Sequence, residues 1–207
     1  MLFRSEAVTL NLINGKAKTV NEILTNLYQN NYKIIEVQKI TEEKTEEIKR
    51  EKDYSGKILY ISWKNRNSII NSRTLEYFQT ALSKAKELKV QEILIELNTF
   101  GGEVDTTLDI SKALIDISSL NKIQTIIFVN SEAISAGAVL ALSCDKIALN
   151  SSATFGATQP ITASWTFTIA PEKVVSMLRA KVQSLANRKN RNPKIASAMV
   201  DVDVLLT

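Results

Sequence analysis

The pattern of apolar and polar residues changes period along this chain, and each period predicts one type of element. Short apolar runs typical of strands occur at residues 58–61, 92–97, 125–130 and 146–149. Apolar residues three and four apart, typical of helices, occur at residues 72–88, 104–118, 133–142, 170–189 and 193–200. Because strands alternate with helices, the pattern predicts an α/β fold with a mostly parallel sheet.

The first 56 residues differ from the rest in their pattern of expected elements and in their charge. A helix, a turn at Asn14-Gly15 and a second helix are expected within residues 5–29, and a strand is expected at residues 32–37. The run TEEKTEEIKREK at residues 41–52 mixes both signs of charge, which is typical of a solvated helix or linker. We therefore divide the chain into residues 1–40, a charged linker at 41–56 and a main domain at 57–207.

Composition narrows the chemistry that this fold can carry. The 207 residues contain no histidine and a single cysteine, Cys144, which is expected to be a small buried residue. Without imidazole there is no Ser-His-Asp triad, no Cys-His pair and no histidine-based zinc site. The general base of an enzyme with this composition has to be a carboxylate, a lysine or the N-terminal amine.

Charge and hydropathy also bear on the partners. Lys and Arg number 26 against 22 Asp and Glu, and no basic stripe with interleaved aromatic residues appears, so nucleic acid is not an expected partner. No apolar run reaches the roughly 18 residues of a membrane-spanning helix. The first residues, MLFRS, do not have the pattern of a signal peptide.

Three features are candidates for chemistry. Gly101-Gly102 follows the strand at 92–97, where bare glycines can bring main-chain N–H groups close to a ligand. Ser135 lies at the start of the helix predicted at residues 133–142, where the helix dipole favours developing negative charge. Lys173 lies near the start of the long helix, and a lysine in an apolar pocket loses its proton more readily and can act as a base. Taken singly, each has a commoner structural reading: a turn, a helix N-cap and a solvated lysine.

Together, the motifs resemble a known family. They are NTFGGEVD at residues 98–105, AISAGA at residues 133–138 and FGATQPI at residues 155–161. In this order they resemble the serine protease domain of the NfeD family, membrane-bound partner proteases of stomatin-type proteins. The resemblance covers roughly residues 57 to 207 and implies a ClpP/crotonase-like fold with repeated strand-strand-helix units.

The resemblance also implies the site. It makes Ser135 the nucleophile and Lys173 the base of a Ser-Lys dyad, and the Ser-Leu-Ala segment that ends at Ala186 selects Lys173 over Lys181. The oxyanion and substrate-binding residues that it implies are Gly101, Gly102, Ala136 and Gly156. No metal and no cofactor are implied.

The implied activity is a serine endopeptidase that cleaves apolar segments of a membrane-associated partner such as a stomatin-like protein. The full-length protein would be membrane-associated and would form a homo-oligomer. Two alternatives remain open: a non-proteolytic scaffold that retains the ClpP-like fold, and an acyl-CoA enzyme of the crotonase type. The Ser-Ala-Gly motif together with Lys173 argues against the second.

The chain departs from the family pattern at three positions. Phe100 replaces the usual proline, Asn98 the usual acidic residue and Asn190 the usual glycine. Residues 1–40 resemble the segment that closes such a domain. We expect them to be the tail of an upstream protease-like unit that precedes a C-terminally truncated domain, with closing elements in permuted order as the alternative.

Overall fold

The computed structural model describes residues 14–28, 33–37, 57–64, 69–163, 167–201 and 203–204. The strands are β1 (Gly15–Lys16), β2 (Lys33–Glu36), β3 (Lys57–Trp63), β4 (Glu92–Thr99), β5 (Gln124–Ile134), β6 (Lys146–Leu149), β7 (Thr154–Gly156), β8 (Ile161–Ala163) and β9 (Phe167–Ile169). The helices are α2 (Val20–Tyr28), α4 (Ser72–Glu87), α5 (Val104–Asn121), α6 (Ala136–Ser143), α7 (Glu172–Arg188) and α8 (Pro193–Ala198). The main sheet has the order β1-β6-β5-β4-β3-β2, and β7 pairs with β5. Its pairs are all parallel, which confirms the predicted fold class.

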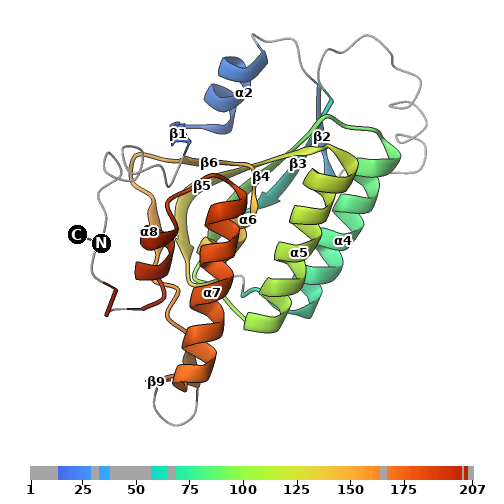
Figure 1. Ribbon diagram of the computed structural model, residues 1–207. Helices are drawn as coiled ribbons and strands as arrows, with labels where there is room; N and C mark the ends of the chain where they lie inside the picture. The colour runs from blue at the N-terminus through green and yellow to red at the C-terminus, as the bar shows by residue number, and fades with distance from the viewer. Residues whose placement is uncertain are drawn as a thin grey trace.

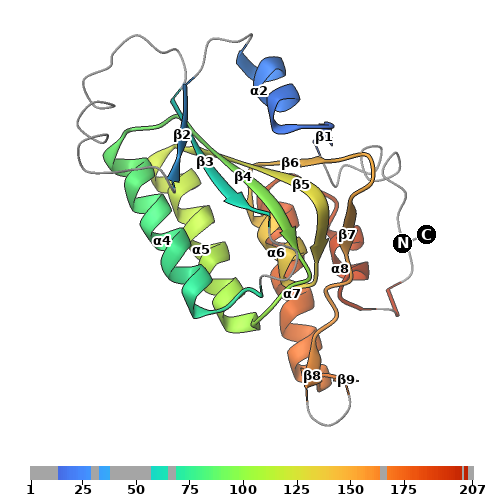
Figure 2. The same cartoon turned by 180° about the vertical axis from the view of Figure 1, so that it is seen from behind.

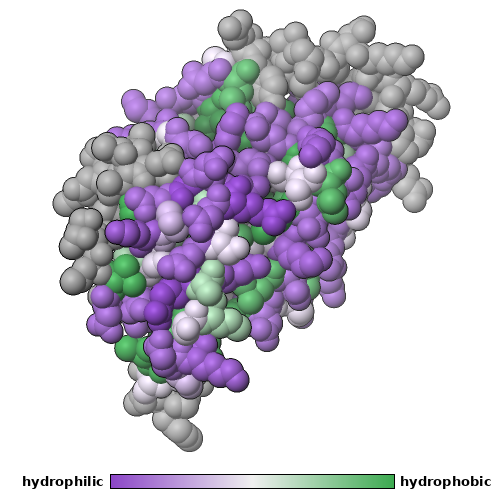
Figure 3. Space-filling view, in the orientation of Figure 1, coloured by the Kyte–Doolittle hydropathy of each residue, from purple (hydrophilic) through white to green (hydrophobic). Residues whose placement is uncertain are grey.

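The sheet is covered by helices α4 to α8 on one face and by α2 on the other (Figures 1 and 2). Strand β4 shows why: Ile93 and Ile95 belong to the core under the helices, whereas Leu94 packs with Leu24 of α2. The sequence of a strand that is buried on both faces is a nearly continuous apolar run, and β4 has such a sequence. The outer side of the helical layer is mainly hydrophilic (Figure 3).

One polar side chain interrupts that apolar run. Glu96 is 3% exposed, and it accepts hydrogen bonds from the Tyr60 hydroxyl and, at 2.7 Å, from Nδ2 of Asn130. Nζ of Lys64 lies 3.0 Å from its carboxylate. Burial and the bond to Glu96 raise the pKa of Tyr60. These partners lie in or directly after β3 and in β5, the two neighbours of β4, so the buried carboxylate is stabilised only once the sheet has assembled.

The repeated strand-strand-helix unit appears at the carboxyl ends of the strands. Each main strand is followed by a short extended segment before the next helix. Ile70 bridges Gly102, Thr99 pairs with Ala133, and β7 pairs with the last residues of β5. These segments form a second, short ladder at the edge of the sheet where the site residues gather.

The predicted helix at 133–142 was wrong at its start. Strand β5 continues to Ile134, and α6 begins at Ala136. The small residues at this point favour a helix locally, but pairing with β4 and β7 holds them extended. Strands β1, β7, β8 and β9 were not predicted, and β1 begins at Gly15, where a turn was expected. The first helix expected within residues 5–13 and the linker at 41–56 lie outside the described residues.

Two strands from the N-terminal part of the chain, β1 and β2, belong to this sheet. Strand β1 pairs with β6 at one edge, and β2 pairs with β3 at the other. Between them α2 crosses the second face and buries Leu24 completely. The assignment of residues 1–40 to an upstream unit stays a prediction.

The turn between α7 and α8 explains one departure from the family pattern. Asn190 has φ +54°, a left-handed conformation that asparagine tolerates better than most residues and that glycine adopts freely. Arg191, only 5% exposed, follows it. Its guanidinium donates to the carbonyl oxygens of Leu142, Cys144 and Asp145 at 2.9, 2.8 and 3.0 Å. This arginine therefore ties the turn to the end of α6.

Beside it, a partly buried ion pair between Asp145 and Lys189 makes stability depend on pH. Asp145 accepts hydrogen bonds from Nζ of Lys189 at 2.5 Å and from the main-chain N–H of Thr125 at 2.7 Å. Burial by itself would raise the pKa of Asp145, but the hydrogen bonds from Lys189, Thr125 and Ser118 outweigh it and hold this pKa below its ordinary value of 3.8. The stability from such a carboxylate is present above the unfolded-state pKa and is lost as the pH falls through the folded-state pKa.

We expect Asp145→Asn to lower the free energy of unfolding most above about pH 5, and this difference to shrink as the pH falls below about 4. Urea unfolding of both proteins between pH 3 and pH 7 measures the difference. Asp116→Asn is the control, because Asp116 is exposed and paired only with Lys112 on the same helix. A difference that does not change with pH would contradict the role of the charged Asp145.

Candidate active site

Ser135 joins strand β5 directly to helix α6 in an unusual conformation. Its φ is +53° and its ψ is −119°, values that belong to the first central position of a type II′ turn, where glycine is normally found. Its N–H donates to the carbonyl oxygen of Gly156 at 2.9 Å. For a residue with a Cβ, such backbone strain costs about 1–3 kcal/mol.

The side chain of Ser135 does not cap the helix that it precedes. No side-chain capping bond is made at this position, and the hydroxyl has no hydrogen-bond partner among the described residues. Ser135 is therefore the N-cap residue of α6 by position, as the structural reading expects, but its hydroxyl does not serve as the cap.

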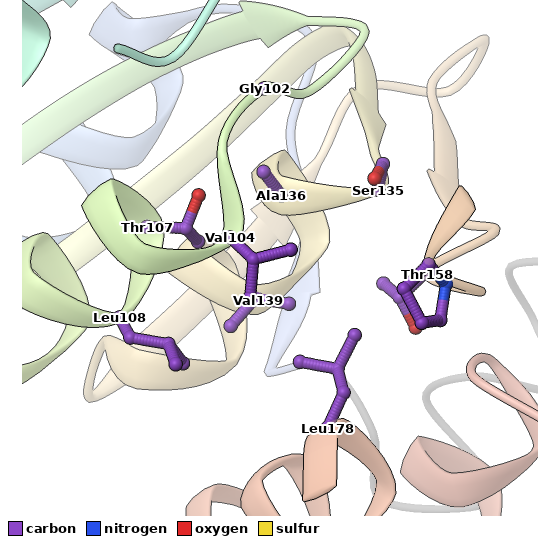
Figure 4. Close-up of a pocket in the computed structure, with 10 residues that line it drawn as sticks. Gly102, Val104, Thr107, Leu108, Ser135, Ala136, Val139, Thr158 and Leu178 are labelled. Atoms are coloured by element: carbon purple, nitrogen blue, oxygen red, sulfur yellow. The ribbon is translucent and has the colours of Figure 1, made fainter. Parts of the chain in front are cut away.

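A small pocket, open to solvent, lies in front of this hydroxyl, and its roughly 300 Å³ of empty space includes solvent at its mouth (Figure 4). Its walls come from the starts of α5 and α6, the middle of α7 and the segment after β7. The lining residues are Gly102, Val104, Thr107, Leu108, Ser135, Ala136, Val139, Thr158, Pro160 and Leu178. Because most of them are apolar, the pocket suits an apolar side chain next to a reactive hydroxyl.

The glycine pair lies against Ser135. Gly101 has φ +118°, and a Cβ at this position would lie 2.7 Å from Cβ of Ser135, so only glycine fits. The main-chain N–H groups of Gly102 and Ala136 have no hydrogen-bond partner in the part of the chain that is described. Two free N–H groups beside a serine hydroxyl can hold the negative oxygen of a tetrahedral intermediate.

Gly156 reaches the site through its main chain. It is buried, has φ +125°, and accepts the N–H of Ser135 through its carbonyl oxygen. The pocket wall on this side is formed by Thr158 and Pro160 instead. Gly156 therefore holds the main chain of the strained serine through this hydrogen bond and does not line the pocket.

Lys173 is the second residue of α7, and its side chain is exposed. It does not line the pocket, although Leu178, about one and a half turns later on the same helix, does. Among the described residues, no hydrogen bond joins Lys173 to Ser135. The Ser-Lys dyad stays a prediction.

Three further features concern the cysteine, groups that could bind a metal, and helices that could cross a membrane. Cys144 is fully buried, as expected, and burial raises the pKa of its thiol to about 12. Within the described ranges, no group of three or more Cys, Asp or Glu side chains is arranged to hold a metal ion. No described helix is both long and apolar enough to cross a bilayer.

Sequence reasoning missed much of the pocket wall. Val104, Leu108, Val139 and Leu178 lie within the helices that the sequence predicts, but nothing in the sequence marked them as pocket residues. Their spacing of three and four residues is the same for a core and for a pocket. Thr99, whose side chain lies under the glycine pair, was also missed.

The comparisons with known proteins agree with this geometry. Residues 67–207 match the family model of the NfeD1b N-terminal domain. The chain is 30% identical over 128 residues to membrane protein NfeD1b of Bacillus subtilis, and 31% identical over 144 residues to membrane-bound protease PH1510 of Pyrococcus horikoshii. The two alignments cover 62% and 67% of this chain but only 28% and 32% of those relatives.

Solved structures show the same fold. A serine-to-alanine variant of the 1510-N membrane-bound stomatin-specific protease is 29% identical, with a TM-score of 0.63 over 74% of each chain. A lysine-to-alanine variant in complex with a substrate peptide also has a TM-score of 0.63, at 29% identity, over 74% of this chain and 70% of that one. Since the family model covers more than half of the sequence, the chain belongs to the family of the NfeD1b N-terminal domain.

Proposed function

We propose that this chain is a serine endopeptidase in which Ser135 is the nucleophile and Lys173 the general base. The conformation of Ser135 carries the proposal, because a serine occupies a position that glycine would hold with less strain. Its free hydroxyl faces an apolar pocket. The relative PH1510, named as a membrane-bound protease, supports the same class of activity.

In the proposed mechanism, neutral Lys173 accepts the proton of the Ser135 hydroxyl while Oγ bonds to the carbonyl carbon of the substrate. The N–H groups of Gly102 and Ala136 hold the resulting oxyanion. The lysine ammonium then gives its proton to the leaving amine, and an acyl-enzyme remains. Water, deprotonated by the same lysine, hydrolyses this ester and restores Ser135.

Because Lys173 is exposed, the proposed mechanism requires that the bound substrate remove water from around its side chain. An ammonium in water holds its proton, whereas removal of water favours the neutral form. In our proposal, an apolar segment seated in the pocket covers the start of α7 and withdraws Lys173 from water. Cleavage is thereby coupled to occupancy of the pocket.

The apolar walls favour an apolar substrate. Phe100 and Ile69, beside the glycine pair, are 47% and 63% exposed and extend the apolar surface beyond the pocket. The relative 1510-N is described as stomatin-specific. We therefore propose that the substrate is an apolar segment of a stomatin-like membrane protein, and that the longer protein is membrane-associated and homo-oligomeric.

One observation favours the alternative of a non-proteolytic scaffold. Lys173 is exposed and, among the described residues, forms no hydrogen bond with Ser135, as is expected of a protein without a working dyad. Such a scaffold would keep the strained turn and the pocket for binding alone.

Labelling with a serine-reactive fluorophosphonate separates the two functions. We expect the full chain to be modified at Ser135, identified by peptide mapping, and Ser135→Ala to remain unmodified. Ser131, an exposed serine four residues earlier, is the internal control and should not react. Absence of an adduct at Ser135, or equal modification of Ser131, would support the scaffold.

A further inference from the structure

Thr99, the last residue of β4, lies beneath the glycine pair and is fully buried. Its Oγ1 accepts the N–H of Gly101 at 3.1 Å. Its methyl group packs against Gly137 of α6, where an added Cβ would lie 2.7 Å from Cγ2 of Thr99. One side chain therefore contacts both walls of the candidate oxyanion hole.

The glycine loop has three successive N–H groups, and two of them are occupied. Gly101 donates to Thr99, and Glu103 donates to the carbonyl oxygen of Ile70 at 2.9 Å. The carbonyl oxygen of Gly101 in turn accepts the N–H of Ile70 at 2.9 Å. The loop is thus held on both sides, and of its three N–H groups only that of Gly102 has no partner among the described residues.

We propose that Thr99 is the positioning residue of this loop: its hydroxyl holds Gly101, so that Gly102 alone presents its N–H to the oxyanion. The inference rests on the proposed peptidase function and adds a residue that does not touch the substrate. Without the hydroxyl, the N–H of Gly101 is buried with no acceptor, and the peptide unit turns to find one. Small displacements of an oxyanion donor lower the rate of the chemical step more than they lower substrate binding.

Two substitutions separate the two halves of the side chain. Thr99→Val keeps the packing against Gly137 and removes the acceptor, whereas Thr99→Ser keeps the acceptor and removes the methyl group. For cleavage of an apolar peptide by the full chain, we expect Thr99→Val to lower kcat about 10- to 100-fold with KM within about 3-fold of the wild type. Thr99→Ser should retain kcat within about 3-fold.

A peptide boronate gives a second readout, because boron bonds to the serine Oγ and presents a tetrahedral oxygen to the hole. Its inhibition constant should rise in Thr99→Val by the same factor by which kcat falls, while the KM of the peptide substrate stays constant. Thr74→Val is the matched control. Thr74 is a buried threonine whose Oγ1 accepts the N–H of Asn71 at 3.2 Å, on α4 and outside the pocket. It should lower Tm without changing kcat.

The outcomes are distinct. Wild-type kcat and boronate inhibition in Thr99→Val, or an equal loss in Thr99→Ser, would overturn the positioning role and leave the peptidase intact, provided that Ser135→Ala is inactive. Full activity of Ser135→Ala, or no hydrolysis by the wild type, would overturn the proposed function and this inference with it.

Discussion

Replacing Ser135 by glycine is expected to abolish peptide hydrolysis and to make the protein more stable. Loss of the nucleophile should lower kcat by at least about 10⁴-fold. Glycine adopts φ +53°, ψ −119° without the clash that a Cβ suffers there, so Ser135→Gly should exceed Ser135→Ala in free energy of unfolding by about 1 kcal/mol. Urea unfolding and a peptide cleavage assay on both variants measure the two effects.

Lys122→Gly is the matched control for the gain in stability. Lys122 ends α5 with φ +58°, lies outside the pocket and is exposed. Glycine should stabilise this helix end as well, by about 1 kcal/mol, without loss of activity. If Ser135→Gly and Ser135→Ala are equally stable, the serine is not strained, and the observation that carries the proposed function is lost.

Replacing Lys173 by alanine is expected to lower kcat roughly 10²- to 10⁴-fold, the range that a general base contributes. Lys173→Arg should be equally inactive, because a guanidinium keeps its proton and cannot act as a base. Lys181→Ala, on the same helix two to three turns later, should keep kcat within about 3-fold. Initial rates with an apolar peptide at saturating concentration give the comparison.

The arginine variant separates a base from a mere positive charge. Activity restored by Lys173→Arg would show that charge alone is needed there. A loss in Lys181→Ala that equals the loss in Lys173→Ala would point to Lys181, eight residues later on α7, as the base instead. Either result would contradict the proposed dyad.

The strands and helices of the main domain were predictable because their apolar periodicity is local. Strand β6 has the predicted bounds, and α4 ends one residue before its predicted end. The end of β5 was not predictable, because residues 131–134 are extended only through pairing with β4 and β7. The short strands β7 to β9 depend on their partners in the same way.

The candidate site was predictable in part. Motif order selected Ser135 and the glycine pair, and the structure brings them into contact. It did not predict Thr99, since a threonine at the end of a strand is an ordinary β residue until its hydroxyl is seen against Gly101. For Lys173 the sequence offered two readings, a desolvated base and a solvated lysine, and the structure shows the side chain exposed, because the surroundings of a helix residue depend on where the helix packs.

The sequence by itself determined the α/β alternation, the family and the absence of imidazole, since each can be read from residue types and their order along the chain. Only the tertiary structure decided that Ser135 takes a glycine-like conformation with its hydroxyl free, and that Gly102 and Ala136 keep unpaired N–H groups beside it. The physical reason is that strain and hydrogen-bond partnership at this turn are imposed by contacts with residues distant in sequence, above all Gly156, Thr99 and Ile70.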